Sequence, residues 1–321
     1  MKIVIPDDYQ DAVRKLACFS KLAGHEVVIH NDTVKDLDAL VARFRDAQAI
    51  VLIRERTRIP RELLERLPKL RLISQTARPG PHIDIVACTE RKIAVAGGAG
   101  GPESTAELAW ALILAASRQV ALEDRRLRTG LWQTTLGTGM FERTLGIYGY
   151  GNIGRLVAKV GAAFGMRLLV WGREGSLARA RADGYACAGS RESFFAESDV
   201  LSLHVRLTPE TRALVRAADL ACMKPDSIFV NTSRAELVES GALAAALARG
   251  RPGFAGVDVF ENEPVLGARD PLLALDNVVC TPHLGYVESR NYEKYFGSAF
   301  DNIVAFASGK PTNVVNPEAL A

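Results

Sequence analysis

Cysteine, histidine and tryptophan are scarce in this chain of 321 residues, which has five cysteines, five histidines and three tryptophans. The cysteines form no C-x-x-C pair and show no spacing typical of metal ligands, so the sequence predicts no metal site. It also argues against a disulfide framework, and small buried thiols are typical of a reducing compartment. We therefore expect a cytoplasmic protein.

The chain also lacks blocks of like charge and long apolar runs. Its formal net charge is only +3 and its arginines are dispersed, so no nucleic-acid partner is expected. The most apolar helical stretch, 108–116, is too short to span a membrane. The chain opens directly on a strand pattern at 2–5 rather than on a signal peptide. These absences indicate a soluble protein without a membrane partner.

The chain is long enough for two domains, and its first hundred residues alternate strand and helix patterns. Amphipathic helical segments are predicted at 8–22, 36–44 and 61–67. Alternation of this kind favours a parallel sheet with flanking helices. No glycine fingerprint occurs here, so this block is expected to make substrate contacts. The strand candidates are Lys2–Ile5, Glu26–His30, Ala49–Ile53, Leu70–Gln75 and Ile93–Ala96.

A glycine-rich link, 97–102, then interrupts the alternation. Glycine absorbs large backbone changes easily, so the link is interpreted as a hinge, with a simple spacer loop as the alternative. A helix is predicted from about Ser104 to Arg128, capped by Ser104 or Thr105 and ended by Gly130-Leu131-Trp132.

The stretch 143–174 predicts a dinucleotide site. A strand at 144–148 is followed by the triplet Gly149, Gly151 and Gly154, a helix to about Phe164 and a second strand at 166–171. The first glycine allows the tight turn, the second lets the backbone approach a pyrophosphate, and the third lets the helix pack on the sheet. The helix N-terminus then faces the anion.

Alternation resumes to the end of the chain, with about six strands beyond Thr144 and a last helix at 288–307. The fold class is therefore α/β, with a doubly wound Rossmann sheet in residues 101–286 and a second α/β domain. By its position the last helix returns to the first domain. That makes a discontinuous substrate domain of residues 1–100 and 287–321. The later strands are predicted at 200–205, 227–231, 256–260 and 278–281, with helices ending near 221 and at 242–248.

Reduction of a carbonyl needs a proton donor and a cation for an anionic substrate. His283 follows Thr281-Pro282 at the end of the last strand, where ligands bind in such sheets, and His204 ends an earlier strand. From position alone His283 is the better candidate and His204 the second. His25 and His30 fit surface or core positions, and His82 fits either role.

Charged residues end two further strands. Arg234 closes the segment 231–234, and Glu263 lies in the segment 258–264 after the next strand. Because parallel strands end along one crevice, Arg234, Glu263 and His283 are predicted to converge there.

Several motifs now agree with a known family. They are Gly149-Tyr-Gly-Asn-Ile-Gly154, Leu203-His-Val-Arg-Leu-Thr-Pro-Glu-Thr211, Asn231-Thr-Ser-Arg234, Asp258-Val-Phe-Glu-Asn-Glu-Pro264 and Thr281-Pro-His-Leu-Gly285, with the helix start at Ala106-Glu107. In order and spacing the chain resembles the D-isomer-specific 2-hydroxyacid dehydrogenases over nearly its whole length. The resemblance implies a flavodoxin-like substrate domain beside the Rossmann domain, and a homodimer.

The resemblance also implies roles. His283 would protonate the carbonyl oxygen as hydride arrives, and Glu263 would pair with His283 and hold its orientation. Arg234 would bind the substrate carboxylate and 2-oxo group through its planar donor fork, and the Arg78-Pro79-Gly80 turn would add backbone N–H groups. Asp258 would hold the nicotinamide side. The implied cofactor contacts are Tyr150, Gly151, Asn152, Ile153, Gly172, Arg173, His204, Val205, Thr211, Thr232, Asp258 and Gly285.

Three residues depart from the family pattern. Ala235 follows the catalytic arginine where glycine is usual, so its backbone is expected to avoid positive φ. Tyr286 replaces a small residue and is expected to wall one side of the pocket. Arg206 replaces a proline, which places a cation near the cofactor phosphates or on the surface.

The end of the second Rossmann strand bears on the choice of nucleotide. Gly172 stands where an NAD enzyme usually has an acidic residue for the ribose 2′-hydroxyl, and Arg173 offers a cation for a 2′-phosphate. Glu174 could still turn back to the ribose. The cofactor is therefore NADP or NAD, and we favour NADP.

The sequence thus predicts an NAD(P)-dependent oxidoreductase that interconverts a 2-oxo acid and a D-2-hydroxy acid. Hydroxypyruvate, glyoxylate and phosphoglycerate all remain open as substrates. Arg54 and Arg78 fit either an extra anionic group of the substrate or a solvated surface. The alternative is a dinucleotide-sensing, corepressor-like protein of the same fold.

Overall fold

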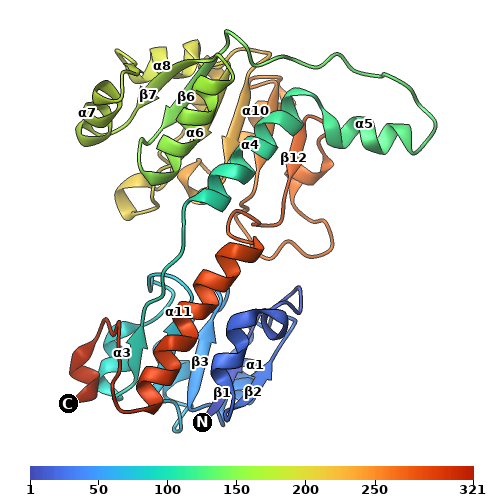
Figure 1. Cartoon of the computed structure of the whole chain (residues 1–321). Coiled ribbons are helices and arrows are strands. Elements are labelled where there is room, and N and C mark those ends of the chain that lie inside the picture. The colour runs from blue at the N-terminus through green and yellow to red at the C-terminus, as the bar shows by residue number, and fades with distance from the viewer. The chain divides into compact units, whose positions relative to one another are not determined.

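The computed structural model describes residues 1–321 and divides into two compact units, each with its own parallel sheet. Unit 1 comprises Met1–Gly101 and Glu288–Ala321, and unit 2 comprises Pro102–Val287 (Figure 1). The chain passes between them twice, at Gly101–Pro102 and at Val287–Glu288. None of its helices is long and apolar enough to cross a membrane.

The five-stranded sheet of unit 1 has the order β2-β1-β3-β4-β5, with all neighbours parallel. This is the flavodoxin-like order. β3 and β4 are buried along their whole length, which explains their continuous apolar runs in the sequence. All five predicted strands are confirmed, with ends that differ by no more than two residues. They are β1 Lys2–Ile5, β2 Glu26–Ile29, β3 Ala49–Leu52, β4 Leu72–Gln75 and β5 Ala94–Ala96.

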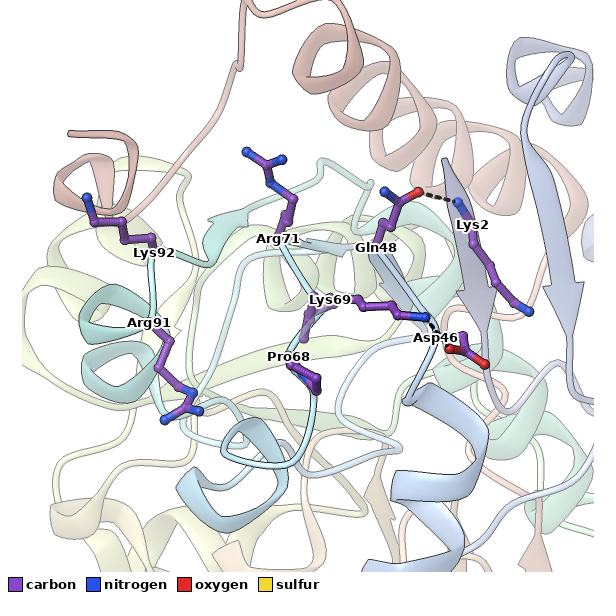
Figure 2. Close-up of a pocket in the computed structure, with 9 residues that line it drawn as sticks. Lys2, Asp46, Gln48, Pro68, Lys69, Arg71, Arg91 and Lys92 are labelled. Atoms are coloured by element: carbon purple, nitrogen blue, oxygen red, sulfur yellow. Dashed lines mark hydrogen bonds and ion pairs between the residues drawn. The ribbon is translucent and has the colours of Figure 1, made fainter.

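Helices α1 (Leu37–Phe44), α2 (Arg61–Leu64) and α3 (Ile85–Glu90) pack their apolar side chains against this sheet in one buried cluster. The side chains of Asp36 and Asp84 cap α1 and α3 by accepting backbone N–H groups. The loops that enter the strands at the amino-terminal edge of the sheet surround a depression rich in basic residues (Figure 2).

The prediction of an amphipathic helix at 8–22 is wrong. This segment forms two 3-10 helices, η1 (Val13–Lys15) and η2 (Ala17–Leu22). Asp11 has a positive φ of 47°, and the Asp8 carboxylate accepts the N–H groups of Ala12 and Val13. An Asp side chain that binds nearby backbone N–H groups competes with the α-helical pattern, and the apolar spacing alone does not reveal this.

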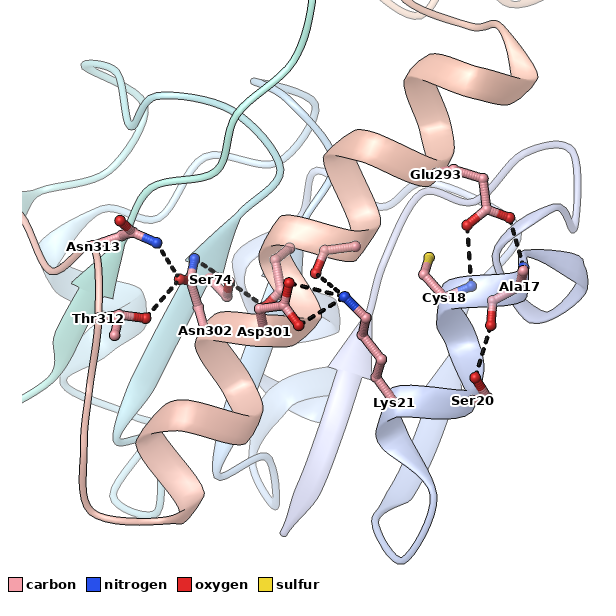
Figure 3. Close-up of polar contacts among 12 residues, drawn as sticks. Ala17, Cys18, Ser20, Lys21, Ser74, Glu293, Asp301, Asn302, Thr312 and Asn313 are labelled. Atoms are coloured by element: carbon pink, nitrogen blue, oxygen red, sulfur yellow. Dashed lines mark hydrogen bonds and ion pairs between the residues drawn. The ribbon is translucent and has the colours of Figure 1, made fainter.

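The last long helix, α11 (Ser289–Ala307), is part of unit 1. Glu293 accepts the N–H groups of Ala17 and Cys18 at 2.6 and 3.0 Å, and Lys21 pairs with Asp301 at 2.7 Å (Figure 3). Farther along, Asn302 donates to the carbonyl oxygen of Gly97 at 3.1 Å. These contacts hold residues nearly 300 positions apart in one unit. After α11 the chain ends in η6 (Pro317–Leu320).

The seven-stranded sheet of unit 2 has the order β12-β11-β10-β9-β6-β7-β8, again entirely parallel. The chain reverses direction across the sheet between β6 and β9, which is the switch point where Rossmann sheets bind ligands. The strands are β6 Thr144–Tyr148, β7 Arg167–Trp171, β8 Ala186–Cys187, β9 Val200–Leu203, β10 Ile228–Asn231, β11 Phe254–Val257 and β12 Val278–Cys280.

The apolar side chains of unit 2 form two buried clusters. One contains residues of α4 (Glu103–Ser117), α6 (Asn152–Ala163) and α7 (Glu174–Ala182). The other contains residues of α8 (Arg191–Glu197), α9 (Ala217–Cys222) and α10 (Ala242–Ala248). A doubly wound sheet is thereby confirmed. The remaining short elements are η3 Pro209–Thr211, η4 Ala235–Leu237 and η5 Pro271–Ala274.

The helix predicted from Ser104 to Arg128 is two helices, α4 and α5 (Val120–Leu127). Gln119 breaks it with a left-handed φ of 51°. The carbonyl oxygen of Ser117, in the last turn of α4, accepts the N–H of Thr138 from the segment that follows α5. A long-range contact thus ends the helix where the local sequence gives no glycine or proline.

Two other details of unit 2 differ from the sequence expectation. β11 begins at Phe254 rather than near Gly256, and the two-residue strand β8 was not predicted. A strand of two residues offers no periodicity that a sequence pattern could reveal.

The glycine-rich link has a packing explanation as well as the hinge interpretation. A Cβ on Gly98 would lie 2.7 Å from the carbonyl oxygen of Gln75, and one on Gly100 would lie 2.1 Å from the ring of Tyr295. Close approach therefore requires glycine at both positions. Movement about the link remains a prediction.

Candidate active site

The site begins with the register of the strands in unit 2. Tyr148, Leu203, Asn231, Val257 and Cys280 are aligned across β6, β9, β10, β11 and β12. The residues that follow them therefore form a continuous rim at the carboxyl edge. They are Gly149, His204, Thr232, Asp258 and Thr281. The rim collects the strand ends that the sequence singled out for chemistry.

The glycine turn has the geometry that its spacing predicts. Gly149 has φ +96°, and a Cβ there would lie 2.5 Å from the carbonyl oxygen of His204. A Cβ on Gly154 would lie 2.3 Å from the carbonyl oxygen of Gly149. Around Gly151, in contrast, no atom lies within 4 Å of a built Cβ, and no side chain caps the helix α6 that starts beside it. Open space at an uncapped helix N-terminus fits a phosphate group.

Two buried polar atoms on the same rim have no protein partner. They are Nδ1 of His204 and Oγ1 of Thr232. The other ring nitrogen of His204 lies 2.8 Å from Oγ of Ser202, and burial lowers the pKa of His204 to about 4, so the imidazole is neutral at pH 7. Buried polar groups are rarely left unpaired, so these two atoms fit contacts with a bound ligand. With the glycine turn they make the crevice suitable for a dinucleotide.

Not every predicted cofactor residue offers a free side chain. The hydroxyl of Tyr150 donates to Asp183 at 2.7 Å, and the ring is buried in the core. The hydroxyl of Thr211 donates to the carbonyl oxygen of Arg206 at 2.7 Å and so closes the loop after β9. Tyr150 can therefore contact a cofactor only through its backbone, and Thr211 contributes chiefly by shaping that loop.

The residues after β7 leave a cation facing solvent. Arg173 is the N-cap residue of α7, and its side chain makes no hydrogen bond or ion pair. Glu174 pairs with Arg181 on the same helix at 2.8 Å, so its carboxylate is engaged away from the end of β7. Arg206, in the loop after β9, is likewise exposed and unpaired.

The predicted contact between His283 and Glu263 is present. Nδ1 of His283 lies 2.7 Å from Oε2 of Glu263, and both side chains are partly exposed, at 26% and 34%. Glu263 is itself held in place because its other oxygen accepts the N–H of Phe260 at 3.0 Å. The second ring nitrogen of His283, Nε2, makes no hydrogen bond within the protein. Nε2 is thus the nitrogen available to a substrate oxygen.

Arg234 belongs to the same electrostatic group. Burial acts to raise the pKa of Glu263, but the hydrogen bond and charge of His283, the Phe260 N–H and the charge of Arg234 together lower it. The segment 231–234 is fixed by Asn231, whose side chain bonds to the N–H of Ser233 and the carbonyl oxygen of Arg234. Ala235 has no positive φ, as expected. The structure thus brings Arg234, Glu263 and His283 together.

Asp258 has a task that sequence reasoning missed. It is fully buried, and one carboxylate oxygen accepts from Thr281 and the Leu284 N–H at 2.6 Å each. The other oxygen accepts the N–H of Gly285 at 2.8 Å. Asp258 therefore ties down both sides of the loop that presents His283, whose backbone has a left-handed φ of 55°. Its position directly after a buried strand was the available signal.

The same loop is anchored from a second direction. The hydroxyl groups of Ser104 and Thr105, at the start of α4, donate to the carbonyl oxygen of Gly285 at 3.0 and 2.8 Å. Tyr286 is buried, and its ring lies edge-on to His283 with centroids 5.7 Å apart. This contact limits the rotation of the imidazole.

The predicted substrate turn Arg78-Pro79-Gly80 belongs to unit 1, where it follows β4. Pro79 lies beside the glycine-rich link, since a Cβ on Gly97 would approach its ring to 3.0 Å. Arg54 follows β3 at the same edge and has a positive φ of 55°. His82 lies 3.4 Å from the side chain of Gln75. These residues occupy the carboxyl ends of the unit 1 strands.

Comparison with known proteins agrees with this geometry. Residues 110–285 match the model of the NAD binding domain of the D-isomer specific 2-hydroxyacid dehydrogenases. The chain belongs to this family. It is a D-2-hydroxyacid dehydrogenase with an NAD(P)-binding domain, and its substrates are 2-oxo and 2-hydroxy acids, as in the family.

Relatives and solved structures extend the match to the whole chain. The chain is 39% identical to a glyoxylate reductase from Aeropyrum pernix, over 88% of this chain and 87% of that protein. An oxidoreductase from Ralstonia solanacearum is 53% identical, with a TM-score of 0.97, over 100% of this chain and 98% of that one. A phosphoglycerate oxidoreductase from Vibrio cholerae is 51% identical, with a TM-score of 0.94, over 96% and 99% of the two chains.

Proposed function

We propose that His283, Glu263 and Arg234 are the catalytic residues of this D-2-hydroxyacid dehydrogenase. The 2.7 Å contact between Nδ1 of His283 and Glu263 is the observation that carries the proposal. It leaves the proton on Nε2 to protonate the carbonyl oxygen of a 2-oxo acid, or to be taken from the 2-hydroxy acid in the reverse direction. Arg234 binds the substrate carboxylate through its guanidinium fork. The nicotinamide, when bound, donates or accepts the hydride.

We propose the rim of unit 2 as the dinucleotide site. The open backbone at Gly151 and the helix N-terminus at Asn152 would hold the pyrophosphate, and His204 and Thr232 would satisfy their unpaired atoms on the nucleotide. Residues 1–101 and 288–321 would then act as the substrate domain, with the backbone N–H groups of Arg78 and Gly80 donating to the substrate carboxylate and Pro79 shaping the turn.

NADP is the preferred cofactor in this proposal. Gly172 has no carboxylate to bind a ribose 2′-hydroxyl, and Glu174 is engaged by Arg181. Arg173 offers an unpaired guanidinium at the end of β7. A 2′-phosphate would therefore meet the cation of Arg173, with which the exposed carboxylate of Glu210 also interacts through its charge.

Replacing Arg173 with Gln is expected to raise the KM for NADPH about 10-fold or more and to leave the KM for NADH within about twofold. A tenfold higher KM corresponds to the loss of one charge-assisted hydrogen bond to the 2′-phosphate. Initial rates with each dinucleotide measure it. Arg167→Gln is the matched control, because Arg167 is an exposed arginine at the opposite end of β7. Wild-type preference for NADH would contradict the proposal.

For the substrate we propose a small 2-oxo acid such as glyoxylate or hydroxypyruvate. The glyoxylate reductase from Aeropyrum pernix matches this chain over nearly the full length of both proteins. The D-3-phosphoglycerate dehydrogenase from Mycobacterium tuberculosis is 38% identical, but the match spans only 51% of that protein. Phosphoglycerate remains the second candidate because of the solved phosphoglycerate oxidoreductase and the cations Arg54 and Arg78.

A substrate panel tests this choice. We expect oxidation of NADPH with glyoxylate and hydroxypyruvate, with the larger hydroxypyruvate giving the higher kcat/KM because Tyr286 offers an aromatic wall. Reduction of NADP⁺ with 3-phosphoglycerate is the comparison. A kcat/KM for phosphoglycerate above that for D-glycerate would favour the second candidate. No turnover with any 2-oxo acid would contradict the catalytic assignment.

We propose a homodimer. The segment between α5 and β6 runs as an open loop in Figure 1 and exposes Trp132 and Leu136 by 75% and 95%. Large exposed apolar groups on one segment are typical of an interface. In sedimentation equilibrium we expect twice the mass of one chain for the wild-type protein and the mass of a single chain for Leu136→Asp. Val86→Asp, at an exposed valine of unit 1, is the control. A wild-type monomer would refute the proposal.

We also propose that the protein works in the cytoplasm. All five cysteines are free, and Cys88 is fully buried, where burial raises its pKa to about 12 and keeps it as an unreactive thiol. Cys222, in contrast, is exposed, and an exposed thiol needs a reducing compartment to persist. Fractionation of the native host tests this assignment, and recovery outside the cytoplasm would contradict it.

A further inference from the structure

The amino-terminal edge of the sheet in unit 1 holds a depression of about 780 Å³. Its lining residues begin or precede four neighbouring strands. They are Lys2 in β1, Gln48 before β3, Lys69 and Arg71 before β4, and Arg91 and Lys92 before β5. The Arg78-Pro79-Gly80 turn follows β4 and so lies at the opposite edge of the sheet. The depression is therefore separate from the residues of unit 1 to which the substrate is assigned.

Positive charge dominates this depression. Five cationic side chains line it, and Asp46 is the only carboxylate among the lining residues (Figure 2). Two cations are neutralised locally, since Lys69 pairs with Asp46 at 2.7 Å and Lys2 pairs with Glu26 at 3.0 Å. Arg71 and Arg91 form no ion pair, whereas Lys92 donates to an oxygen of the last residue, Ala321, at 3.1 Å. Two guanidinium groups therefore remain without a carboxylate.

Cations near helix C-termini often do no more than offset the helix dipole. That account fits Arg91, which donates to the carbonyl oxygen of Glu65 just after α2 at 3.3 Å. Lys92 is already engaged by an oxygen of Ala321 at 3.1 Å. The helix-dipole account does not fit Arg71, which precedes a strand and whose side chain makes no hydrogen bond or ion pair. An unpaired guanidinium between other cations indicates an anionic partner from outside the chain.

The chemistry of the lining restricts that partner. No aromatic side chain lines the depression, so no nucleobase can stack there. The backbone N–H groups of Lys2 and Arg71 are already bonded to Gln48, so these two residues can bind an anion only through their side chains. A single exposed ion pair contributes at most about 1 kcal/mol, so a monoanion would bind weakly. A ligand with several charges would engage both unpaired guanidinium groups at once.

We propose that this basic depression binds a small non-aromatic molecule carrying at least two negative charges on phosphate groups. The planar fork of Arg71 matches a phosphate in bidentate geometry, and Arg91 and Lys92 add charge on the same side of the sheet edge. The volume of the depression lies within the range of small-molecule sites, about 300–1,000 Å³.

Calorimetric titration with pyrophosphate tests the proposal on the enzyme saturated with its preferred dinucleotide, so that the glycine turn is occupied. We expect one saturable site, about tenfold weaker binding for both Arg71→Gln and Arg91→Gln, and a change within about twofold for Arg45→Gln. Arg45 is an exposed, unpaired arginine of unit 1 outside the lining. Inorganic phosphate should bind at least about tenfold more weakly than pyrophosphate.

Because two variants are tested, the result does not depend on a single side chain. Thermal melting shows whether each variant is folded. Absence of saturable binding to the wild-type enzyme would overturn the proposal. So would equal pyrophosphate affinity in the wild type and in both folded variants. Equal affinity for phosphate and pyrophosphate would overturn the requirement for two charged groups.

Discussion

Substitution of His283 by Gln is expected to lower kcat for 2-oxo acid reduction by about 10²–10⁴-fold, the usual contribution of a general acid. Glutamine retains a polar side chain of similar reach but cannot deliver a proton from Nε2. The loss should appear in kcat and kcat/KM alike, because proton transfer stabilises only the transition state. Stopped-flow or steady-state oxidation of the reduced dinucleotide measures it.

The control separates chemistry from binding. Dinucleotide affinity of the His283→Gln variant should match the wild type, since the glycine turn, His204 and Thr232 follow strands other than β12. His25→Gln is the matched histidine variant, because His25 precedes β2 in unit 1 and contacts only the amino terminus of Met1. A His283→Gln enzyme that keeps more than about a tenth of the wild-type kcat is incompatible with general-acid catalysis.

The stability contributed by the His283–Glu263 pair depends on pH through the carboxyl group of Glu263. Its pKa is lowered in the folded protein, because the contacts from His283, Phe260 and Arg234 outweigh the effect of burial. A carboxyl group with a lowered folded pKa stabilises the protein above its unfolded pKa of about 4.3, and this contribution is lost as pH falls through the lower folded value. The His283–Glu263 pair should therefore remain intact at pH 5.

The candidate site residues could be grouped from the sequence because they follow the ends of strands. Parallel strands in one sheet align their carboxyl ends, so Arg234, Glu263 and His283 could be grouped before any contact was known. The register then explains the grouping, since Asn231, Val257 and Cys280 are neighbours across three strands. Buried strands are also easy to find, because they are continuous apolar runs.

The features that the sequence did not reveal depend on contacts between side chains and backbone groups that are far apart in the chain. The carboxylate of Asp258 holds the loop of His283 through three hydrogen bonds, and no spacing rule marks it as an anchor. The left-handed Gln119 divides one predicted helix into two, although glutamine favours helices. In both cases tertiary contacts, rather than local sequence preference, determine the backbone conformation.

Arg234 provides the second large effect. Arg234→Gln removes the cation that would meet the substrate carboxylate, and the kcat/KM for the 2-oxo acid is expected to fall by about 10²–10³-fold, equivalent to about 3–4 kcal/mol. Arg234→Lys keeps the charge but loses the planar fork, so an intermediate loss of about 10–100-fold is expected. Both variants should raise KM, because the carboxylate is bound in the ground state as well as in the transition state.

The local structure sets the control for Arg234. Its main-chain carbonyl is held by Asn231, and its guanidinium donates to the carbonyl oxygen of Ser233 at 2.7 Å, so substitution could disturb the segment 231–234. Thr232 lies in that segment, and unchanged dinucleotide affinity would show that the rim is intact. Arg249→Lys, at an exposed arginine that ends α10, is the matched conservative change. If Arg234 binds the substrate carboxylate in the ground state, its removal must raise KM. An unaltered KM in Arg234→Gln, even with a lower kcat, would therefore rule out carboxylate binding by Arg234.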